Sequence, residues 1–235
     1  MSKRKTAIVT GASRGIGKAI AQKLAKENFN VIIFGRNEKK LKAVKNNLVK
    51  FGVSSEYYSG DVSDEKFVNQ SVADIIKKYK NIDLLINNAG VAIFELFTES
   101  TLENFKTQID ANLIGVYNFS KAVINGMIKK QSGSIINIVS QAGKSGFAYG
   151  STYAATKHAV MGLSKSLMLE VRKHNIKVMT VCPGSTETEM IENSPIHKNI
   201  KQVLKPNDVA EIVYAAIKLP QRALVSDLEI RPNNP

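Results

Sequence analysis

The chain has 235 residues, of which 43% are apolar and 23% charged, and its formal net charge is +13. This length suits one α/β domain, and the composition excludes both a disordered chain and a protein with apolar membrane spans. The single cysteine, Cys182, excludes an internal disulfide and favours a reducing, cytoplasmic setting.

The positive charge is compatible with an anionic substrate, a nucleic acid or an acidic carrier protein. Most of the basic residues are lysines spread along the chain, which indicates a solvated surface. No RNA-binding signature and no block of interleaved basic and aromatic residues occurs, so we predict no nucleic-acid partner. No cluster has the spacing of metal ligands, so we predict no metal site.

Short apolar runs alternate with stretches of helical spacing along the whole chain. Strands are expected at residues 5–10, 31–34, 55–58, 83–86, 134–139, 177–181 and 224–230. Helices are expected at residues 18–28, 38–51, 65–79, about 101–130 and about 151–174. Residues 185–205 have only weak periodicity and are expected to form a loop, which we interpret as a candidate lid.

Strands that alternate with helices predict a parallel sheet covered on both faces. We therefore expect a Rossmann-type, doubly wound α/β fold with three α/β/α layers, formed by residues 1–235 as one domain. Ligands of such folds bind beyond the carboxyl ends of the strands. Gly11, Asn87, Ser140 and Pro183 all fall at such strand ends.

Three glycines, Gly11, Gly15 and Gly17, lie between the first expected strand and the first expected helix. In this context glycines allow the backbone to approach a pyrophosphate at a helix N-terminus. A tight turn with close helix packing is the alternative. The spacing is G-x-x-x-G-x-G, which differs from the commoner G-x-G-x-x-G.

Tyr153 and Lys157 are four residues apart on an expected helix and therefore share one face. A free tyrosine titrates near ~10, and a fixed positive neighbour lowers that pKa. We expect Lys157 to lower the pKa of Tyr153, as acid–base catalysis at neutral pH requires. Taken alone, Tyr153 would be a core tyrosine and Lys157 a solvated lysine.

Four motifs, in this order and spacing, resemble those of the classical short-chain dehydrogenase/reductase family, and the match covers nearly the whole chain. They are Thr10-Gly-x-x-x-Gly-x-Gly17, Asn87-Asn-Ala-Gly90, Ser140 and Tyr153-x-x-x-Lys157. The resemblance implies hydride transfer between a nicotinamide cofactor and a carbonyl or secondary alcohol.

The same resemblance implies a role for each catalytic residue. Tyr153 is the general acid and base, and Lys157 holds the ribose hydroxyls and lowers the pKa of Tyr153. Ser140 donates a hydrogen bond to the carbonyl oxygen as charge develops there. Asn112 carries a water-linked proton relay to the lysine, with a buried asparagine bonded only to backbone as the alternative.

The resemblance also implies a cofactor-binding set. It consists of Gly11, Ser13, Arg14, Gly15, Ile16, Gly17, Arg36, Asp61, Val62, Asn88, Ala89, Gly90, Tyr153, Lys157, Pro183, Gly184, Thr186 and Thr188. Asp61 and Val62 would hold the adenine, and the residues from Pro183 to Thr188 the carboxamide. The alternatives are a turn aspartate for Asp61, an ordinary turn for residues 87–90 and a helix cap for Thr188.

An acidic residue at the end of the second strand would hydrogen-bond the ribose and repel a 2′-phosphate. Gly35 and Arg36 stand there instead, and Arg14 adds a second guanidinium that can bind phosphate. We therefore expect NADP(H) in preference to NAD(H). A solvated surface arginine is the alternative for Arg36.

The substrate is expected to contact Ser140, Phe94, Phe147, Tyr149 and Met190, although each apolar residue could instead serve packing. Residues 205–232 resemble the ending of small 3-hydroxy acid and carbonyl reductases and lack the glycine-rich ending common in 3-oxoacyl carrier-protein reductases. We expect NADPH-dependent reduction of small ketones or 3-oxo acids, with the reverse reaction on 3-hydroxy acids.

One alternative function is a 3-oxoacyl-[acyl-carrier-protein] reductase, for which the acidic acyl carrier protein would be a partner. A remote alternative is a binding protein that senses NADP(H) without turnover. The family resemblance implies a homodimer or homotetramer, assembled through the expected helices at 101–130 and 151–174.

Overall fold

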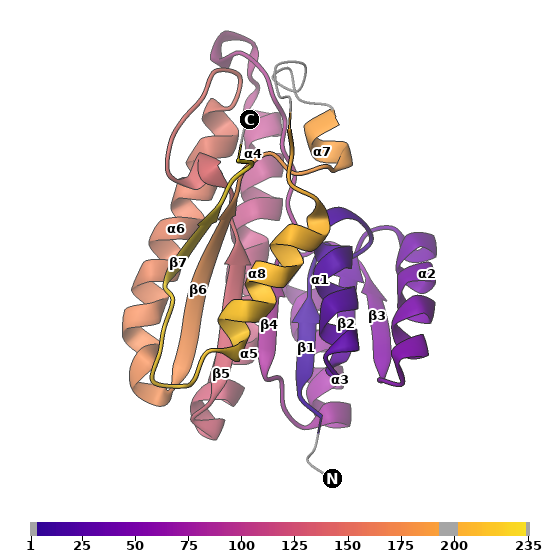
Figure 1. Ribbon diagram of the computed structural model, residues 1–235. Helices are drawn as coiled ribbons and strands as arrows, with labels where there is room; N and C mark the ends of the chain where they lie inside the picture. Colours follow the sequence, from indigo (N-terminus) through magenta and orange to yellow (C-terminus); the bar gives the residue numbers. More distant parts are fainter. Residues whose placement is uncertain (1–3, 193–201, 234–235) are drawn as a thin grey trace.

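A seven-stranded parallel sheet forms the centre of the chain in the computed structural model, which describes residues 4–192 and 202–233. The strand order is β3-β2-β1-β4-β5-β6-β7 (Figure 1). The strands are β1 Thr6–Val9, β2 Asn30–Gly35, β3 Ser55–Ser59, β4 Leu84–Asn87, β5 Gly133–Ile138, β6 Ile176–Pro183 and β7 Asp227–Ile230. The order reverses between β1 and β4, which is the mark of a doubly wound fold.

Helices cover both faces of the sheet and complete the predicted three layers. They are α1 Gly15–Lys26, α2 Glu38–Leu48, α3 Glu65–Tyr79, α4 Leu102–Ile109, α5 Gly115–Lys130, α6 Ser151–Val171, α7 Glu189–Glu192 and α8 Pro206–Lys218. One apolar cluster joins α1, α2 and α8 to the sheet, and a second joins α3, α5 and α6 to the opposite face. In Figure 1, α1 and α8 lie side by side across the front of the sheet.

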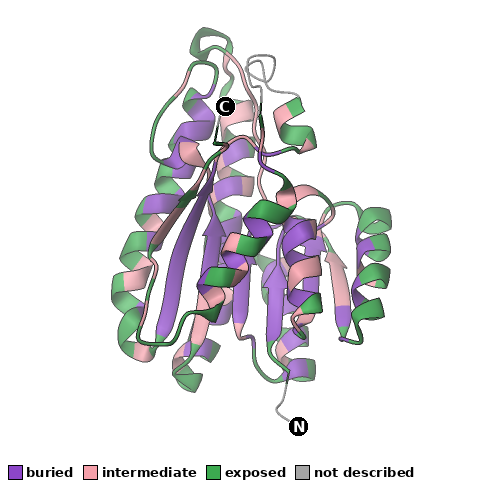
Figure 2. Ribbon diagram, in the orientation of Figure 1, coloured by how far each residue is buried: buried purple, intermediate pink, exposed green. Residues whose placement is uncertain are grey.

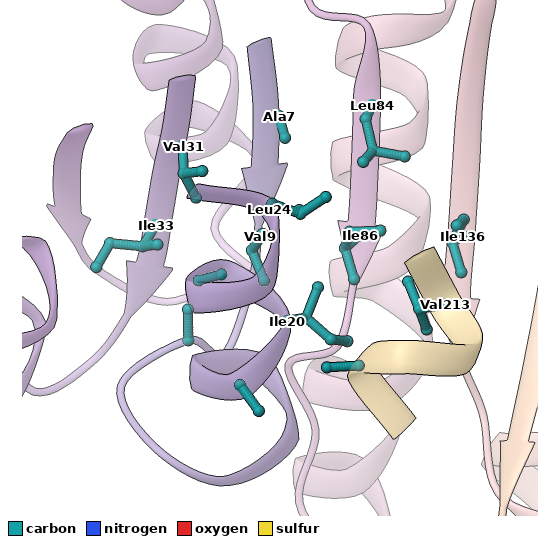
Figure 3. Packing of buried hydrophobic residues seen from close by; sticks show 14 of the residues in the cluster. Ala7, Val9, Ile20, Leu24, Val31, Ile33, Leu84, Ile86, Ile136 and Val213 are labelled. Atoms are coloured by element: carbon teal, nitrogen blue, oxygen red, sulfur yellow. The ribbon is translucent and has the colours of Figure 1, made fainter. Parts of the chain in front are cut away.

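The inner strands of the sheet are buried on both faces. Every residue of β1 and of β6 is buried, as expected for parallel strands covered on both sides. Figure 2 shows these buried strands between helices whose outer faces are exposed. On the α1 face, Ile20 of α1 and Val213 of α8 pack over Val9, Ile86 and Ile136 (Figure 3).

The segment expected as one helix at about 101–130 is interrupted. Between α4 and α5 the backbone forms a π-helical turn, η3, at Asp110–Ile114. Such turns often occur at functional sites because they change which side chains face inward. The predicted catalytic residue Asn112 lies in this turn.

Two helices near the C-terminus were not predicted. Helix α7 lies within the segment expected to be a loop, residues 185–205, and Thr186 pairs with Leu204 in a parallel bridge. Residues 193–201 of that loop lie outside the described residues, and the lid interpretation stays a prediction. Helix α8 begins with Pro206, and Asp208 accepts a hydrogen bond from the Lys205 backbone N–H at 2.8 Å. No helix in the described ranges has the length and hydropathy needed to cross a membrane.

Candidate active site

A cavity of about 910 Å³ lies at the carboxyl ends of β1, β2, β4, β5 and β6. Its walls come from the loop before α1, the end of β2, the loops after β3, β4 and β5, helix α6 and the segment after β6. Nearly all of the predicted site residues line it. The exceptions are Gly17, Asn112 and Tyr149.

The loop before α1 has the backbone shape that an anionic ligand requires. Gly11 and Gly15 have φ of +64° and +54°, a region that favours glycine. A Cβ at Gly11 would lie 2.7 Å from the Ala89 Cα, and Gly17 packs equally closely against Gly11 and Asn88. The first turn of α1 contains no acidic side chain and no side-chain cap. The N-terminus of this helix therefore fits a pyrophosphate.

Thr10 and Asn88 hold the glycine loop against the loop after β4. The Thr10 hydroxyl accepts hydrogen bonds from the backbone N–H groups of Asn88 and Ala89, both at 3.0 Å. The Asn88 amide donates to the carbonyls of Thr10 and Gly11, both at 3.1 Å. Asn88 thus supports the loop through its side chain. Thr10 belongs to the motif, but sequence reasoning gave it no role.

Cationic side chains surround the part of the cavity next to the end of β2. Arg14 and Lys40 both form ion pairs with Glu189 of α7, with a distance of 3.4 Å for Lys40. Arg36 is exposed at the cavity edge. No acidic residue stands at the end of β2, as the sequence indicated.

Asp61 lines the cavity and also makes a local turn. Its Oδ1 accepts hydrogen bonds from the Ser63 backbone N–H at 2.8 Å and from the Ser63 hydroxyl at 2.7 Å. The Ser63 backbone bond is the main cause of a lowered Asp61 pKa, with the positive charge of Arg36 contributing. Asp61 therefore has the geometry of the turn alternative and is nevertheless at the cavity wall. The next residue, Val62, is buried and lines the same wall.

The segment after β6 folds back on itself beside the glycine loop. The Gly184 N–H donates to the Ile230 carbonyl at 2.8 Å, and the Thr186 hydroxyl donates to the Gly184 carbonyl at 2.9 Å. The Thr188 hydroxyl donates to the Thr186 carbonyl at 3.1 Å, and Thr188 stands directly before α7, where its carbonyl accepts from the Ile191 N–H at 3.0 Å. Pro183, the last residue of β6, also lines the cavity.

Tyr153 and Lys157 are both buried on α6, with 7% and 6% of their surface exposed. The Lys157 ammonium lies 5.7 Å from the centroid of the Tyr153 ring and donates to the Ile138 carbonyl at 3.2 Å. Ser140 hydrogen-bonds to the Tyr153 phenol, and its hydroxyl accepts from the Ala142 N–H at 3.1 Å. The three side chains therefore converge at one end of the cavity.

The pKa values of this pair differ from the sequence expectation. Burial raises the pKa of Tyr153 to about 12, and only the Ser140 hydrogen bond opposes that rise. Burial lowers the pKa of Lys157 to about 8. Lys157 was expected to lower the Tyr153 pKa. Among the effects of the protein's own groups, burial has the largest influence on both pKa values, because it disfavours the charged form of each side chain.

Two buried amides tie the loop after β4 to α6. Asn112 accepts from the Val91 N–H at 2.8 Å and donates to the Val91 carbonyl and the Thr156 hydroxyl, both at 2.9 Å. It is thus bonded to more than backbone, but it does not line the cavity. Gln108, one helical turn earlier, accepts from the Ile93 N–H at 3.1 Å and donates to the Thr152 hydroxyl at 2.8 Å.

Gln108 was missed in the sequence. The one signal in the sequence was its spacing from Asn112, since residues four apart on a helix share a face. Its two bonds connect segments 15 and 44 residues away. Thr152 and Thr156 precede Tyr153 and Lys157 by one residue each, so both amides act next to the predicted catalytic pair.

Aromatic side chains form the wall beside the Tyr153 phenol. The Phe94 ring lies 5.9 Å from the Tyr153 ring and 6.0 Å from the Phe147 ring. Met190 also lines the cavity. Tyr149 does not line the cavity; it has a φ of +66° before α6, and 41% of its surface is exposed. No group of His, Cys, Asp and Glu within the described ranges could hold a metal ion.

Known proteins resemble this chain in sequence and in fold. Residues 5–199 match the family model described as short chain dehydrogenase. A 3-oxoacyl-[acyl-carrier-protein] reductase of Chlamydia muridarum is 40% identical over 187 residues, which cover 79% of this chain and 75% of that protein.

Two solved structures resemble the whole fold. A metagenomic short-chain oxidoreductase in complex with NADP has 31% identity and a TM-score of 0.87, covering 99% of both chains. An alcohol dehydrogenase from the archaeon Thermococcus sibiricus, complexed with 5-hydroxy-NADP, has 29% identity and a TM-score of 0.91, covering 99% of this chain and 98% of that one.

Proposed function

Since the chain belongs to the short-chain dehydrogenase family, we propose that it is an NADP(H)-dependent oxidoreductase that interconverts a carbonyl and a secondary alcohol. The observation that carries this proposal is the convergence of Tyr153, Ser140 and Lys157 at one end of a cavity. The other end of that cavity offers an uncapped helix N-terminus and several cations. This arrangement suits a bound dinucleotide whose reactive end reaches the phenol.

The cofactor supplies the hydride when bound, and the side chains handle the proton and the oxygen. We assign proton donation to the Tyr153 Oη, which is protonated at neutral pH because burial raises its pKa to about 12. The Ser140 hydroxyl donates a hydrogen bond to the substrate oxygen as negative charge develops there. Lys157 holds a positive charge beside the phenol at pH 7, because its pKa of about 8 lies above that pH.

NADP(H) is favoured over NAD(H) by the charges at the end of β2. Arg14 and Arg36 line the cavity at the end of β2, where the adenosine ribose of a Rossmann-type fold is held, and Lys40 is joined to this place by its ion pair with Glu189. An arginine there accommodates a 2′-phosphate, whereas an acid would repel it. The related NADP-bound structures agree with this preference. The other residues of the cofactor-binding set that the family resemblance implies are proposed to bind the cofactor as well.

The substrate is proposed to be a small ketone or a 3-oxo acid, or a 3-hydroxy acid in the reverse direction. Phe94 and Phe147 offer an apolar wall next to the Tyr153 phenol, together with Met190. Such a wall would take a short carbon chain and keep water from the reacting carbonyl. Tyr149 is omitted from this set because it does not line the cavity. The single cysteine is buried, and we place the enzyme in a reducing cytoplasm.

A second candidate function is 3-oxoacyl-[acyl-carrier-protein] reduction. It is favoured by the identity of 40% to the chlamydial enzyme and by the net charge of +13, which would attract an acidic carrier. A binding protein that senses NADP(H) without turnover is disfavoured because Ser140, Tyr153 and Lys157 are all present and adjacent.

The test is to follow NADPH and, separately, NADH by absorbance while the purified protein meets a panel of carbonyl compounds. The panel contains 3-oxo esters, diketones, quinones and 3-oxoacyl thioesters, with 3-hydroxy acids and NADP⁺ in reverse. We expect turnover with NADPH on small 3-oxo compounds. A strong preference for thioesters on the carrier protein would favour the second candidate. Tight NADPH binding with no turnover on any compound would contradict both.

A further inference from the structure

The carboxylate of Glu189 lies between two cations at the adenosine end of the cavity. It forms an ion pair with the Arg14 guanidinium, and its Oε1 lies 3.4 Å from the Lys40 Nζ. Arg14 comes from the glycine loop, Lys40 from the first turn of α2 and Glu189 from α7. One negative side chain thus joins three segments that are far apart in the sequence.

These cations stand where a 2′-phosphate would bind. The Ala12 N–H donates to the Phe34 carbonyl at 3.0 Å, which fixes the glycine loop against the end of β2. A Cβ at Gly35 would lie 3.7 Å from the Ser13 Cβ, so Arg14 is next to the residue position that selects the ribose form. The Lys40 backbone N–H donates to the Asn37 side chain at 2.9 Å in the first turn of α2, and the Lys40 ammonium reaches Glu189 from there.

Other acidic groups near this site have other partners or form no ion pair with Arg14 or Lys40 among the described residues, as is the case for Glu187. Glu38 accepts a hydrogen bond from the Tyr57 hydroxyl at 3.2 Å, and Asp61 is engaged by Ser63. Glu192 lies on α7 with Glu189 and lines the cavity, but it forms no ion pair with Arg14 or Lys40 in the described chain. Glu189 is therefore the carboxylate that meets the phosphate-binding cations.

We propose that Glu189 is a specificity-determining residue whose carboxylate competes with the 2′-phosphate of NADP(H) for Arg14 and Lys40. This inference rests on the proposed cofactor. The Arg14 and Glu189 side chains are 55% and 49% exposed, and an ion pair so exposed is weak. A phosphate monoester carries more negative charge than a carboxylate at neutral pH and can displace it. Glu189 therefore lowers the affinity for a 2′-phosphorylated ribose without preventing its binding.

The experiment measures two nicotinamide-free fragments by calorimetry, 2′,5′-ADP and 5′-AMP, which differ only in the 2′-phosphate. Glu189→Gln removes the competing charge, and Glu192→Gln removes one charge from the same helix as a matched control. We expect Glu189→Gln to tighten 2′,5′-ADP binding by about two- to fivefold relative to 5′-AMP at low salt, the range expected for an exposed ion pair. Glu192→Gln should leave that ratio unchanged. The gain should shrink in concentrated salt because exposed charges are screened.

An unchanged ratio in Glu189→Gln, or an equal change in Glu192→Gln, would overturn the inference. Neither fragment can be reduced, so the result does not depend on turnover. If the unmodified protein binds 5′-AMP but gains nothing from the 2′-phosphate, both the NADP(H) assignment and this inference fail. If it prefers 2′,5′-ADP and Glu189→Gln has no effect, only this inference fails.

Discussion

Burial moves the pKa values of Tyr153 and Lys157 in opposite directions, to about 12 and about 8. At neutral pH the phenol is then a proton donor, as carbonyl reduction requires. Alcohol oxidation needs the tyrosinate, so its rate should rise with pH while the phenol is mostly protonated. Above about pH 8 Lys157 loses its proton, and the positive charge beside the phenol disappears with it.

The role of Tyr153 is tested by Tyr153→Phe, which removes the hydroxyl and keeps the ring against Phe94. We expect turnover to fall by about 10²- to 10⁴-fold, the usual contribution of a general acid, with NADPH affinity nearly unchanged. Absorbance assays give the first quantity and fluorescence titration the second. Tyr149→Phe is the matched control, because Tyr149 lies outside the cavity and should be dispensable. Near-normal turnover in Tyr153→Phe would contradict the assignment.

The bond between Gln108 and Thr152 is tested by Thr152→Val, a substitution of similar shape without the hydroxyl. It leaves the Gln108 amide buried without this partner, which should cost about 1–3 kcal/mol of unfolding free energy. Thr152→Ser retains the hydroxyl and should lose much less. Urea unfolding measures both variants. Equal stability of the valine and serine variants would show that the hydrogen bond contributes nothing.

The candidate site could be predicted where short spacing carries the information. Tyr153 and Lys157 share a helix face, and the glycines of the Gly11–Gly17 motif mark the passage from a strand to a helix. Both patterns are visible in the sequence. Gln108 and Glu189 could not be found in this way. Their partners Thr152 and Lys40 lie 44 and 149 residues away. The spacing of Gln108 from Asn112 indicates only a shared helix face, and nothing local marks Glu189. The burial that raises the Tyr153 pKa could not be predicted from the sequence either.

At the scale of elements, all seven strands were predicted. The strands β1, β2 and β4 are short apolar runs, whereas β3 and β7 mix polar and apolar residues and lie at the two edges of the sheet. The π-helical turn at Asp110–Ile114 was not predicted, and the single helix expected at about 101–130 consists of α4 and α5 on either side of it. Helix α8 also escaped, although Pro206 at its start and Val209 and Val213 on its buried side are typical signals. Helix α7 is a single turn, too short for any periodicity.

Strand β7 is joined to the segment after Ser140 by charged side chains. The Lys144 ammonium lies 3.0 Å from Asp227 and 3.2 Å from Glu229, and the Gln141 amide donates to Glu229 at 3.3 Å. Lys144→Met should lower the unfolding free energy by about 1 kcal/mol, the upper range for partly exposed pairs. That loss corresponds to about 2–4 °C in Tm. Turnover should fall too, because Ser140 begins this segment.

The difference in unfolding free energy between Lys144→Met and the unmodified protein should depend on pH. Burial raises the Asp227 pKa, but the hydrogen bonds from Lys144, Thr180 and Cys182 and the Lys144 charge together outweigh it, so the pKa is lowered. Arg231 and Lys144 lower the pKa of Glu229. A carboxyl whose pKa is lowered by folding stabilises the fold at pH values above its ordinary pKa. This stabilisation is lost as the pH falls through the lowered pKa. Thermal melts of Lys144→Met and of the unmodified protein should therefore differ at pH 7 and converge as the pH falls below the ordinary carboxyl range of about 4. A difference that persists in acid would mean that Lys144 acts through packing.

At the scale of the whole molecule, the described surface exposes large apolar side chains on the helices that were expected to mediate assembly. Tyr117 of α5 is 48% exposed and Leu169 of α6 is 61% exposed, and Leu102 at the start of α4 is 66% exposed. An interface between copies of the chain would bury such side chains. We expect these helices to pair in a homodimer or homotetramer, so that light scattering gives two or four times the monomer mass.

Replacing Tyr117 and Leu169 together by glutamate should shift the protein to monomer, because buried like charges would face each other across an interface with two-fold symmetry. Phe51→Glu is the control, since Phe51 is also 43% exposed but follows α2 near the opposite edge of the sheet. That variant should keep the unmodified mass. A monomeric unmodified protein at all concentrations, or an unchanged mass in the double variant, would contradict assembly through α5 and α6. If the double variant is monomeric but still binds 2′,5′-ADP, the cofactor site is complete within one chain, as the cavity formed by a single copy predicts.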